Sequence, residues 1–260
     1  MARINMIDPH TPKNSLPVGL SDLDYNLVFS DEFMGENLDT KKWTARNQYR
    51  GIGNSNVEWW YKPENVRMAG GGNNALAIDV GKLSENVYSG GRIDSQGKFD
   101  FVYGVFESRI HVPKTEGHLA AVWLQAADGL PEYQDVTART GAEFDILESN
   151  TNKDQYAITL HWGGYGKYHQ QSSVNVLAPK LRQVWYHTFG VIWEPNKIIF
   201  IYDGKAIRTI TDPNLISQVK EFPILSNEVI KFAEGDIRTC SLDQSATVYI
   251  DYVRIWQKKI

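Results

Sequence analysis

Apolar and polar residues alternate in many short segments of this chain, a pattern typical of β-strands that bury one face. In residues 103–112, Phe106 and Ile110 fall on one face, while Glu107 and Arg109 fall on the other. We expect this acid and base to form an ion pair, either beneath a functional site or on a solvent-facing surface. Similar patterns predict strands at residues 27–33, 76–80, 143–148, 156–162, 185–193, 197–202 and 248–256.

Turn residues separate these segments, and only residues 214–220 favour a short helix. Asp203-Gly204 predicts a hairpin turn between two strands. Residues 1–24 contain three prolines and many polar residues, which predicts an extended N-terminal leader. Because no internal repeat or second domain is visible, residues 25–260 are predicted to form one all-β domain.

Residues 143–148, with the sequence EFDILE, stand out from the other segments. Three carboxylates occur within six residues, and every residue between them is apolar. A solvated charge run would have polar residues between its acids, whereas Phe144, Ile146 and Leu147 favour a strand packed against a core. The acids therefore share a strand with buried residues and line something other than bulk solvent; the alternative is an exposed acidic strand.

Strand geometry relates the three acids to one another. Glu143 and Asp145 point to the same face, and an ideal strand would send Glu148 to the opposite one. One extra residue, bulged near Ile146-Leu147, would return Glu148 to the common face. The two glutamates would then lie roughly 13 Å apart along the backbone. Over a concave sheet their side chains could lean together, bringing the carboxyl groups to the separation of about 5–5.5 Å that a retaining glycosidase needs. Close acids push their pKa values apart, so one can stay ionised while another holds a proton.

Composition excludes several classes of protein. The 260 residues can bury a large core, and the net charge of -4, with both signs mixed, predicts no nucleic-acid partner. No apolar stretch reaches the length of a membrane span, and residues 1–9 lack the apolar segment of a signal peptide. The single cysteine, Cys240, excludes an internal disulfide and a cysteine-based metal site. Aromatic residues make up 12% of the chain, and we expect some of them to pack on sugar rings.

The acidic segment resembles the bulged Glu-x-Asp-x-x-Glu signature of glycoside hydrolase family 16, the laminarinase, agarase and carrageenase group. The opening residues 29–33 (FSDEF) and the closing residues 251–254 (DYVR) are also similar to segments of that family, and the resemblance runs from about residue 27 to 257. It implies a concanavalin-like β-jelly-roll sandwich of two antiparallel sheets with a concave substrate cleft. Residues 25–260 would then be a single catalytic domain.

The resemblance also implies roles for individual residues. Glu143 would be the nucleophile, Glu148 the general acid/base, and Asp145 the residue that orients and tunes them. Trp123 would lie at the floor of the catalytic subsite, and His161 near the acid/base. These roles belong to an endo-acting glycosidase that retains the anomeric configuration.

One segment departs from the family pattern. Leu119, Ala120 and Val122 stand where the family has Trp, Pro and Phe. The departure removes one expected sugar-stacking platform and weakens the inference of a laminarinase substrate.

Five further residues are candidate substrate contacts. One of the adjacent Trp59 and Trp60 is expected to meet sugar, since neighbours on a strand face opposite ways. Arg50 and Asn54 lie in a polar loop that would wall the cleft, with a solvated loop as the alternative. Arg92 would bind a hydroxyl or carboxylate, with a surface ion pair as the alternative.

A structural calcium ion is a further expectation. Many family members hold calcium between an opening acid and a closing Asp, which correspond to Glu32 and Asp251. Oxygen ligands suit calcium, but two carboxylates alone do not define a site. No cofactor is expected for catalysis, because His161 and His169 lack the spacing of a metal centre.

These observations predict an endo-hydrolase that cuts internal β-linkages of a polysaccharide, with a β-1,3- or mixed-linked glucan ranked first. The basic residues Arg46, Arg50, Arg92 and Lys167 also allow a galactan substrate of the agar, porphyran or carrageenan type, sulfated or not. A non-catalytic carbohydrate-binding jelly roll is the rival from another class. We expect a monomer without a membrane span, acting outside the cell, at its surface or in the periplasm.

Overall fold

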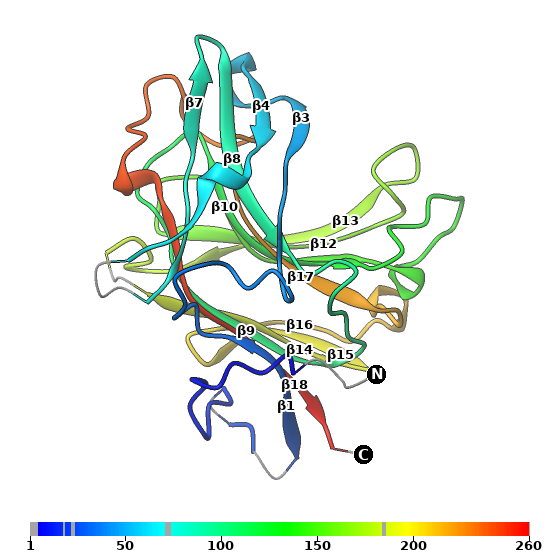
Figure 1. The fold of residues 1–260 in the computed structure, drawn as a ribbon. Coiled ribbons are helices and arrows are strands. Elements are labelled where there is room, and N and C mark those ends of the chain that lie inside the picture. Colours follow the sequence, from blue (N-terminus) through cyan, green and yellow to red (C-terminus); the bar gives the residue numbers. More distant parts are fainter. Residues whose placement is uncertain (1–4, 18, 22–23, 71–73, 184–185, 260) are drawn as a thin grey trace.

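The computed structural model describes residues 5–17, 19–21, 24–70, 74–183 and 186–259, and its described elements are almost all strands. Two β-sheets lie face to face (Figure 1). The strands of the outer sheet are Tyr25–Asp31 (β1), Val66–Met68 (β5), Leu76–Ile78 (β6), Gly104–His111 (β9), His187–Glu194 (β14), Lys197–Tyr202 (β15), Lys205–Ile210 (β16) and Val248–Lys258 (β18).

The second sheet is larger and carries the acidic segment. Its strands are Thr44–Ala45 (β2), Gln48–Ile52 (β3), Glu58–Tyr61 (β4), Gly81–Ser84 (β7), Val87–Asp94 (β8), Leu119–Ala126 (β10), Glu143–Ser149 (β11), Gln155–Trp162 (β12), Gln170–Leu177 (β13) and Glu221–Glu228 (β17). The order is β13-β12-β11-β10-β17-β8-β4-β3, with β2 and β7 also beside β8. Among the described strands, β4 and β8 form the one parallel pair.

The outer sheet runs in the order β16-β15-β14-β9-β18-β6-β5, with β1 beside β18. Strands that are neighbours in space are often distant in sequence, which is the arrangement of a jelly roll rather than of simple hairpins. The all-β sandwich expected from the sequence is therefore confirmed.

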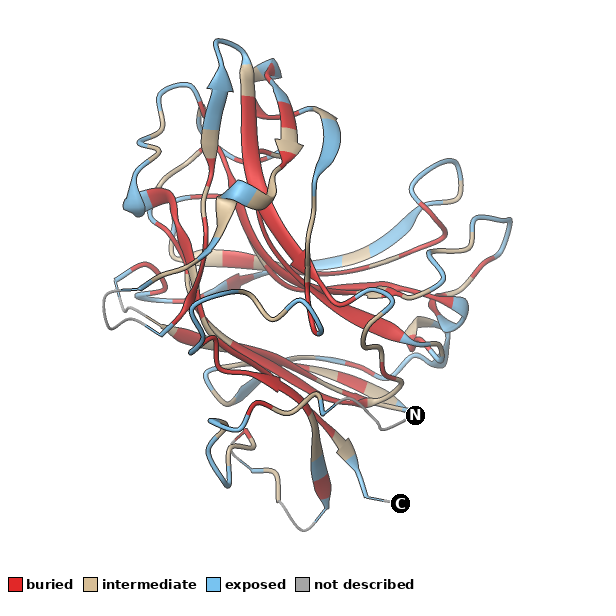
Figure 2. Cartoon of the chain, viewed as in Figure 1, coloured by how far each residue is buried: buried red, intermediate tan, exposed pale blue. Residues whose placement is uncertain are grey.

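The hydrophobic core lies between the two sheets, where buried residues follow the strands of both layers (Figure 2). Phe144 and Leu147 of β11 reach into it from one side, and Phe106, Val191 and Phe200 reach into it from the other. Burial of these alternate positions leaves the other face of β11 pointing away from the core. That outward face carries the acids.

The ten-stranded sheet is strongly curved, and β3, β4, β7 and β8 rise at one end of it (Figure 1). The concave side of the curve is the side away from the outer sheet. This shape gives the exposed face of β11 a raised wall built from the β3–β4 hairpin and β8.

Two sequence expectations are corrected by the fold. The helix expected at residues 214–220 is a single 3₁₀ turn at Pro213–Leu215, where the Asp212 side chain accepts from the backbone N–H of Asn214. Glu107 and Arg109 lie on β9 in the outer sheet, so they are not beneath the acids of β11. Arg109 instead pairs with Asp251 on the neighbouring β18.

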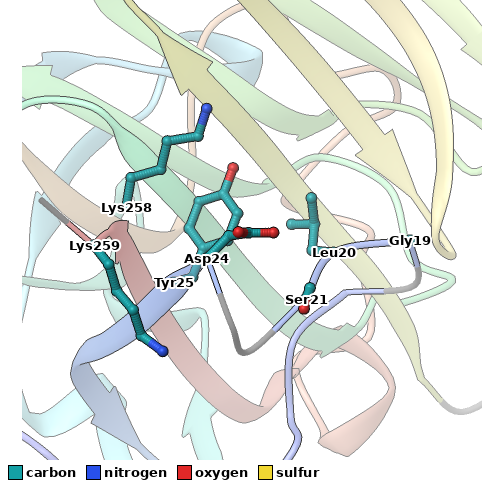
Figure 3. A pocket seen from close by; sticks show the side chains of 7 residues that line it. All are labelled: Gly19, Leu20, Ser21, Asp24, Tyr25, Lys258 and Lys259. Atoms are coloured by element: carbon teal, nitrogen blue, oxygen red, sulfur yellow. The ribbon is translucent and has the colours of Figure 1, made fainter.

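The described part of the N-terminal segment contains several turns and lies against the outer sheet. Met6 accepts a backbone hydrogen bond from Ser30, and the Asp8 carboxylate accepts from the backbone N–H of Glu32. Farther along, a cavity of about 500 Å³ separates this segment from the end of β18 (Figure 3). Its lining residues are Gly19, Leu20, Ser21, Asp24, Tyr25, Lys258 and Lys259. This cavity belongs to the outer layer and is distinct from the face of β11 that carries the acids.

No helix among the described residues is long and apolar enough to cross a membrane.

Candidate active site

A β-bulge interrupts β11 at Ile146. Trp123 of β10 pairs with Asp145, while the adjacent Val122 pairs with Leu147, so Ile146 is the extra residue between them. The register with β12 shifts over the same stretch. The extra residue inferred from the spacing of the acids is therefore present.

The bulge gathers the three carboxylates on the face of the sheet that points away from the core. Ligand atoms of Glu143, Asp145 and His161 all lie within 4.8 Å of one another. Glu148 is close enough for its charge, like that of Asp145, to raise the pKa of Glu143. The intervening Phe144 is fully buried in the core cluster on the other side.

Two of the carboxylates accept hydrogen bonds from neighbouring strands and loops. The Oε2 of Glu143 accepts from the Tyr165 hydroxyl and, at 3.2 Å, from Nε2 of Gln125. The same amide group of Gln125 donates to the Tyr165 oxygen at 2.6 Å. On the other side of Asp145, the Oε2 of Glu148 accepts from Thr159 Oγ1 at 2.9 Å. Glu143 thus has two donors, which stabilise its ionised form against the effect of burial.

The central acid, Asp145, faces a pair of histidines. His161 Nε2 lies 3.2 Å from its Oδ2, without the alignment of a hydrogen bond, and that oxygen is buried. The other ring nitrogen of His161 is 2.8 Å from Nε2 of His169, and the two rings stack. His169 therefore holds His161 beside Asp145, and the role of His161 near the acid/base stays a prediction.

Burial raises the pKa of all three carboxyl groups. The pKa of Glu143 rises to about 8, first through burial and then through the charge of Asp145, while the Tyr165 hydrogen bond opposes the rise. Burial, followed by the charges of Glu148 and Glu228, raises the pKa of Asp145 well above its usual range. The pKa of Glu148 is also raised by burial. Since adjacent buried acids cannot all ionise, the cluster retains protons at neutral pH.

The retained protons can be assigned from the neighbours. A proton on Asp145 removes the second-largest cause of the raised pKa of Glu143. Glu143 then ionises against the donors Tyr165 and Gln125. Glu148 has one donor, Thr159, and the charge of His161 also favours its ionised form, whereas burial and the charge of Glu228 raise its pKa.

Trp123 and Arg92 form the floor beside the acids. The Arg92 guanidinium lies 4.9 Å from the centre of the Trp123 ring and 5.7 Å from that of Tyr61. Its Nε also donates to Asp94 Oδ2 at 3.0 Å, and Arg92 is buried. Arg92 therefore makes a buried ion pair within this floor, rather than the surface ion pair considered as its alternative.

The two adjacent tryptophans face opposite ways, as expected. Trp59 shares a face with Tyr61, and Arg50 lies 5.8 Å from the centre of the Trp59 ring. Trp59 is only 2% exposed and packs in a buried cluster with Val229 and Ile237. Trp60 instead packs against Tyr49 with tilted rings, on the opposite side. Trp59 is thus the one directed to the face of the acids, but Arg50 is the group presented there.

Asn54 has a structural role that sequence reasoning did not foresee. Its Nδ2 donates to the backbone oxygens of Ala233 and Gly235, at 2.7 and 3.2 Å, and its Oδ1 accepts from the backbone N–H of Ile237 at 2.9 Å. The side chain is buried and anchors the loop that follows β17. The prediction that Asn54 contacts substrate is therefore wrong, because its amide already serves the backbone.

The family model for glycosyl hydrolases family 16 matches residues 53–254, which is most of the chain and includes the whole acidic strand. The chain belongs to glycosyl hydrolases family 16.

Several relatives extend the comparison within family 16. The chain is 26% identical to glucan endo-1,3-beta-glucosidase A1 of Niallia circulans over 90% of its own length and 38% of that protein. It is also 26% identical to a beta-glucanase of Rhodothermus marinus, over 90% of this chain and 85% of that protein. The chain thus spans under half the length of the first of these relatives.

Solved structures share the fold of this family 16 chain. The X-ray structure of an endo-beta-1,3-glucanase from Pyrococcus furiosus superimposes with a TM-score of 0.70 at 21% identity, over 90% of this chain and 95% of that one. The sandwich and its two sheets are therefore those of the family.

The calcium site implied by family 16 does not fit the donors found here. Arg254 donates to both oxygens of Glu32, at 2.9 and 2.7 Å, and Arg109 donates to Asp251 at 2.6 Å. A carboxylate already neutralised by a guanidinium is a weak ligand for a cation. Two ion pairs therefore stand where a shared calcium site was expected.

Three residues of this family 16 site were missed by sequence reasoning. Gln125 lies two positions after Trp123 on β10, so the two-residue period of a strand could have found it. Tyr165 lies in the glycine turn between Gly163 and Gly166, and Glu228 lies at the end of β17. Neither has a local sequence signal, because each reaches the acids only through the tertiary fold.

Proposed function

We propose that this chain is a retaining endo-hydrolase of a β-glucan with β-1,3 or mixed linkages. The bulge at Ile146 carries the proposal, because it brings Glu143 and Glu148 to one face of the sheet with Asp145 between them. Two carboxylates that can share one sugar linkage are the requirement of retaining hydrolysis. The glucanase names of the relatives support a glucan as the substrate.

The first step is attack by an ionised Glu143 oxygen on the anomeric carbon. As that bond forms, the bond to the leaving oxygen breaks, and Glu148 transfers its proton to that oxygen. Glu148 is left as a carboxylate. In the second step it takes a proton from water, whose oxygen attacks the anomeric carbon and releases Glu143, so the original configuration returns.

Asp145 acts between the two glutamates as a proton-holding neighbour. While it is protonated it can donate to a glutamate, and it adds no charge beside Glu143. His161, held by His169, limits how Asp145 can turn. The Tyr165 hydroxyl and the Gln125 amide hold the other side of the nucleophile.

A polysaccharide panel tests this function directly. Reducing ends released from β-1,3-glucan, mixed-linked β-glucan, agar and carrageenan are compared for the wild type, Glu143→Gln and Glu148→Gln. We expect cleavage of a β-glucan by the wild type, and a loss of at least 10³-fold in each variant, in line with loss of nucleophilic or general acid catalysis. Binding of sugar without cleavage of any member would favour the non-catalytic jelly roll instead.

A galactan is the second candidate, favoured by the guanidinium groups along the floor. Arg50 is exposed and lies 5.2 Å from the centre of the Tyr61 ring, so it presents a positive charge to the concave face. A sulfate ester would suit such a group. If the substrate is sulfated, Arg50→Ala lowers kcat/KM on that polymer tenfold or more; on a neutral glucan the change is within threefold.

The remaining proposals concern the location and the oligomeric state of the enzyme. A polysaccharide too large to enter a cell implies that the enzyme acts outside the cell, at its surface or in the periplasm. We propose that it acts as a monomer, because the site is assembled from strands and loops of one chain.

A further inference from the structure

Glu228 is a buried acid that neither the sequence motif nor the proposed mechanism uses. It ends β17 and is 4% exposed. Its Oε1 accepts two hydrogen bonds, from the Tyr61 hydroxyl at 2.6 Å and from Ser226 Oγ at 2.7 Å. Both are short, as hydrogen bonds to a charged acceptor are. A buried carboxylate is costly unless it is paired in this way.

The network continues from Glu228 to the catalytic floor. Ser226 Oγ, which gives its proton to Glu228, accepts from Trp123 Nε1 at 3.2 Å. The Trp123 indole is thus tied through one serine to the carboxylate. Tyr61 is tied to the same oxygen from the opposite side, and burial followed by the charge of Glu228 raises its pKa, so it stays a donor.

Charged groups surround this network from three strands. Arg92 of β8 lies over both the Trp123 and the Tyr61 rings, and Arg50 of β3 lies over Tyr61. On β11, Asp145 and Glu148 are near enough that the charge of Glu228 raises their pKa values. Glu228 is therefore placed between the floor and the acids, with hydrogen bonds to the first and electrostatic contact with the second.

We propose that Glu228 is a positioning residue, which fixes the Trp123 indole as the surface on which the sugar next to the catalytic acids packs, while the fully buried Tyr61 holds the Glu228 carboxylate in place. The proposal rests on the proposed hydrolytic function. It assigns Glu228 no contact with the sugar. Its charge has a second consequence, because a negative group near Glu148 helps that acid to keep its proton.

Three variants separate the hydrogen bonds from the charge. Glu228→Gln keeps an oxygen that can accept from Tyr61 and Ser226 but removes the charge. Glu228→Ala removes both, and Ser226→Ala removes the link to Trp123 together with one of the two donors to Glu228, leaving Tyr61 as the other. The matched control is Glu107→Gln, because Glu107 is also buried and accepts from a tyrosine, Tyr252 at 2.7 Å, but lies in the outer sheet.

The variants are compared by kcat, KM and pH profile on the polymer that the wild type cuts, after thermal melting shows that each is folded. We expect Glu228→Ala to lower kcat/KM at least tenfold, mostly through KM, and Ser226→Ala to lower it about threefold to tenfold. Glu228→Gln should stay within threefold at its optimum. Its basic limb should move to lower pH, because Glu148 loses its proton more easily. Glu107→Gln should match the wild type.

Several results would overturn the proposal. One is Glu228→Ala within twofold of the wild type, and another is equal loss in Glu228→Ala and Glu228→Gln with an unmoved basic limb. If Glu228→Ala does not fold, a wild-type KM in Ser226→Ala together with a wild-type profile in Glu228→Gln overturns it. If the wild type cuts no polymer, the proposed function is wrong, and so is this proposal, which rests on it. If the wild type cuts and the variants match it, only this proposal fails.

Discussion

The hydrogen bond from Tyr165 to Glu143 makes the sharpest prediction about the pH dependence of catalysis. Tyr165→Phe removes one hydroxyl and keeps the ring. The hydroxyl stays protonated at any working pH, because burial and the charge of Glu143 raise the pKa of Tyr165. It therefore stabilises Glu143 only when Glu143 is ionised. Without it the pKa of Glu143 rises, and the acidic limb of the kcat/KM profile moves to higher pH.

The size of the shift follows from the strength of the bond and its exposure. A hydrogen bond to a charged group contributes about 1.5–3 kcal/mol. Tyr165 as a whole residue is 61% exposed although its hydroxyl is surrounded by protein, so water can partly replace that hydroxyl, and the lower end applies. About 1.5 kcal/mol corresponds to roughly one pKa unit. The acidic limb should move up by about one pH unit, while the plateau changes by less than about threefold, because the nucleophile loses its charge on attack.

The assay is kcat/KM between pH 4 and 9 on the preferred polymer. Tyr49→Phe is the matched control, since Tyr49 is also exposed but packs against Trp60, away from the acids. An acidic limb that stays in place in Tyr165→Phe would refute the role of this hydroxyl. A limb that moves equally in Tyr49→Phe would show that the shift is not specific to the site.

Three other predictions concern stability. The pKa of Glu143 is raised from 4.5 to about 8 in the folded state. Between these two pH values the folded chain binds more protons than the unfolded chain, so stability falls as pH rises. Glu143→Gln should therefore raise Tm by a few degrees at pH 8 and by less at pH 5; an equal gain at both pH values would contradict the burial argument. Asn54→Ala leaves backbone groups of three loop residues without partners, so it should cost about 2–3 kcal/mol in urea unfolding with an unchanged KM; a raised KM at normal stability would return Asn54 to the sugar site. Because Glu32 and Asp251 are held by arginines, EDTA should shift Tm by less than about 1 °C, whereas a large fall reversed by calcium would restore the calcium site.

The acidic strand could be predicted in detail because its information is local. The two-residue period of a strand and the five-residue separation of Glu143 and Glu148 require one extra residue, and the bulge at Ile146 supplies it. The core residues of β11 follow from the same alternation. These conclusions need no knowledge of which strands are neighbours.

The parts that could not be predicted depend on long-range contacts. The sequence places Glu107 and Arg109 on one strand face but does not say that β9 joins the outer sheet. The local sequence around a loop asparagine such as Asn54 is the same whether its side chain binds sugar or the backbone. Glu228 and Tyr61 come together across 167 positions of sequence, and no spacing rule covers such a distance.

Trapping the glycosyl-enzyme tests the central claim most directly. A 2-deoxy-2-fluoro β-glucoside with a good leaving group slows the second step more than the first, so a covalent intermediate accumulates on a retaining enzyme. Peptide mapping by mass spectrometry should place one added sugar on Glu143. An adduct on Asp145 or Glu148 would contradict the assigned roles, and no adduct, together with products of inverted configuration, would contradict the shared-linkage geometry itself.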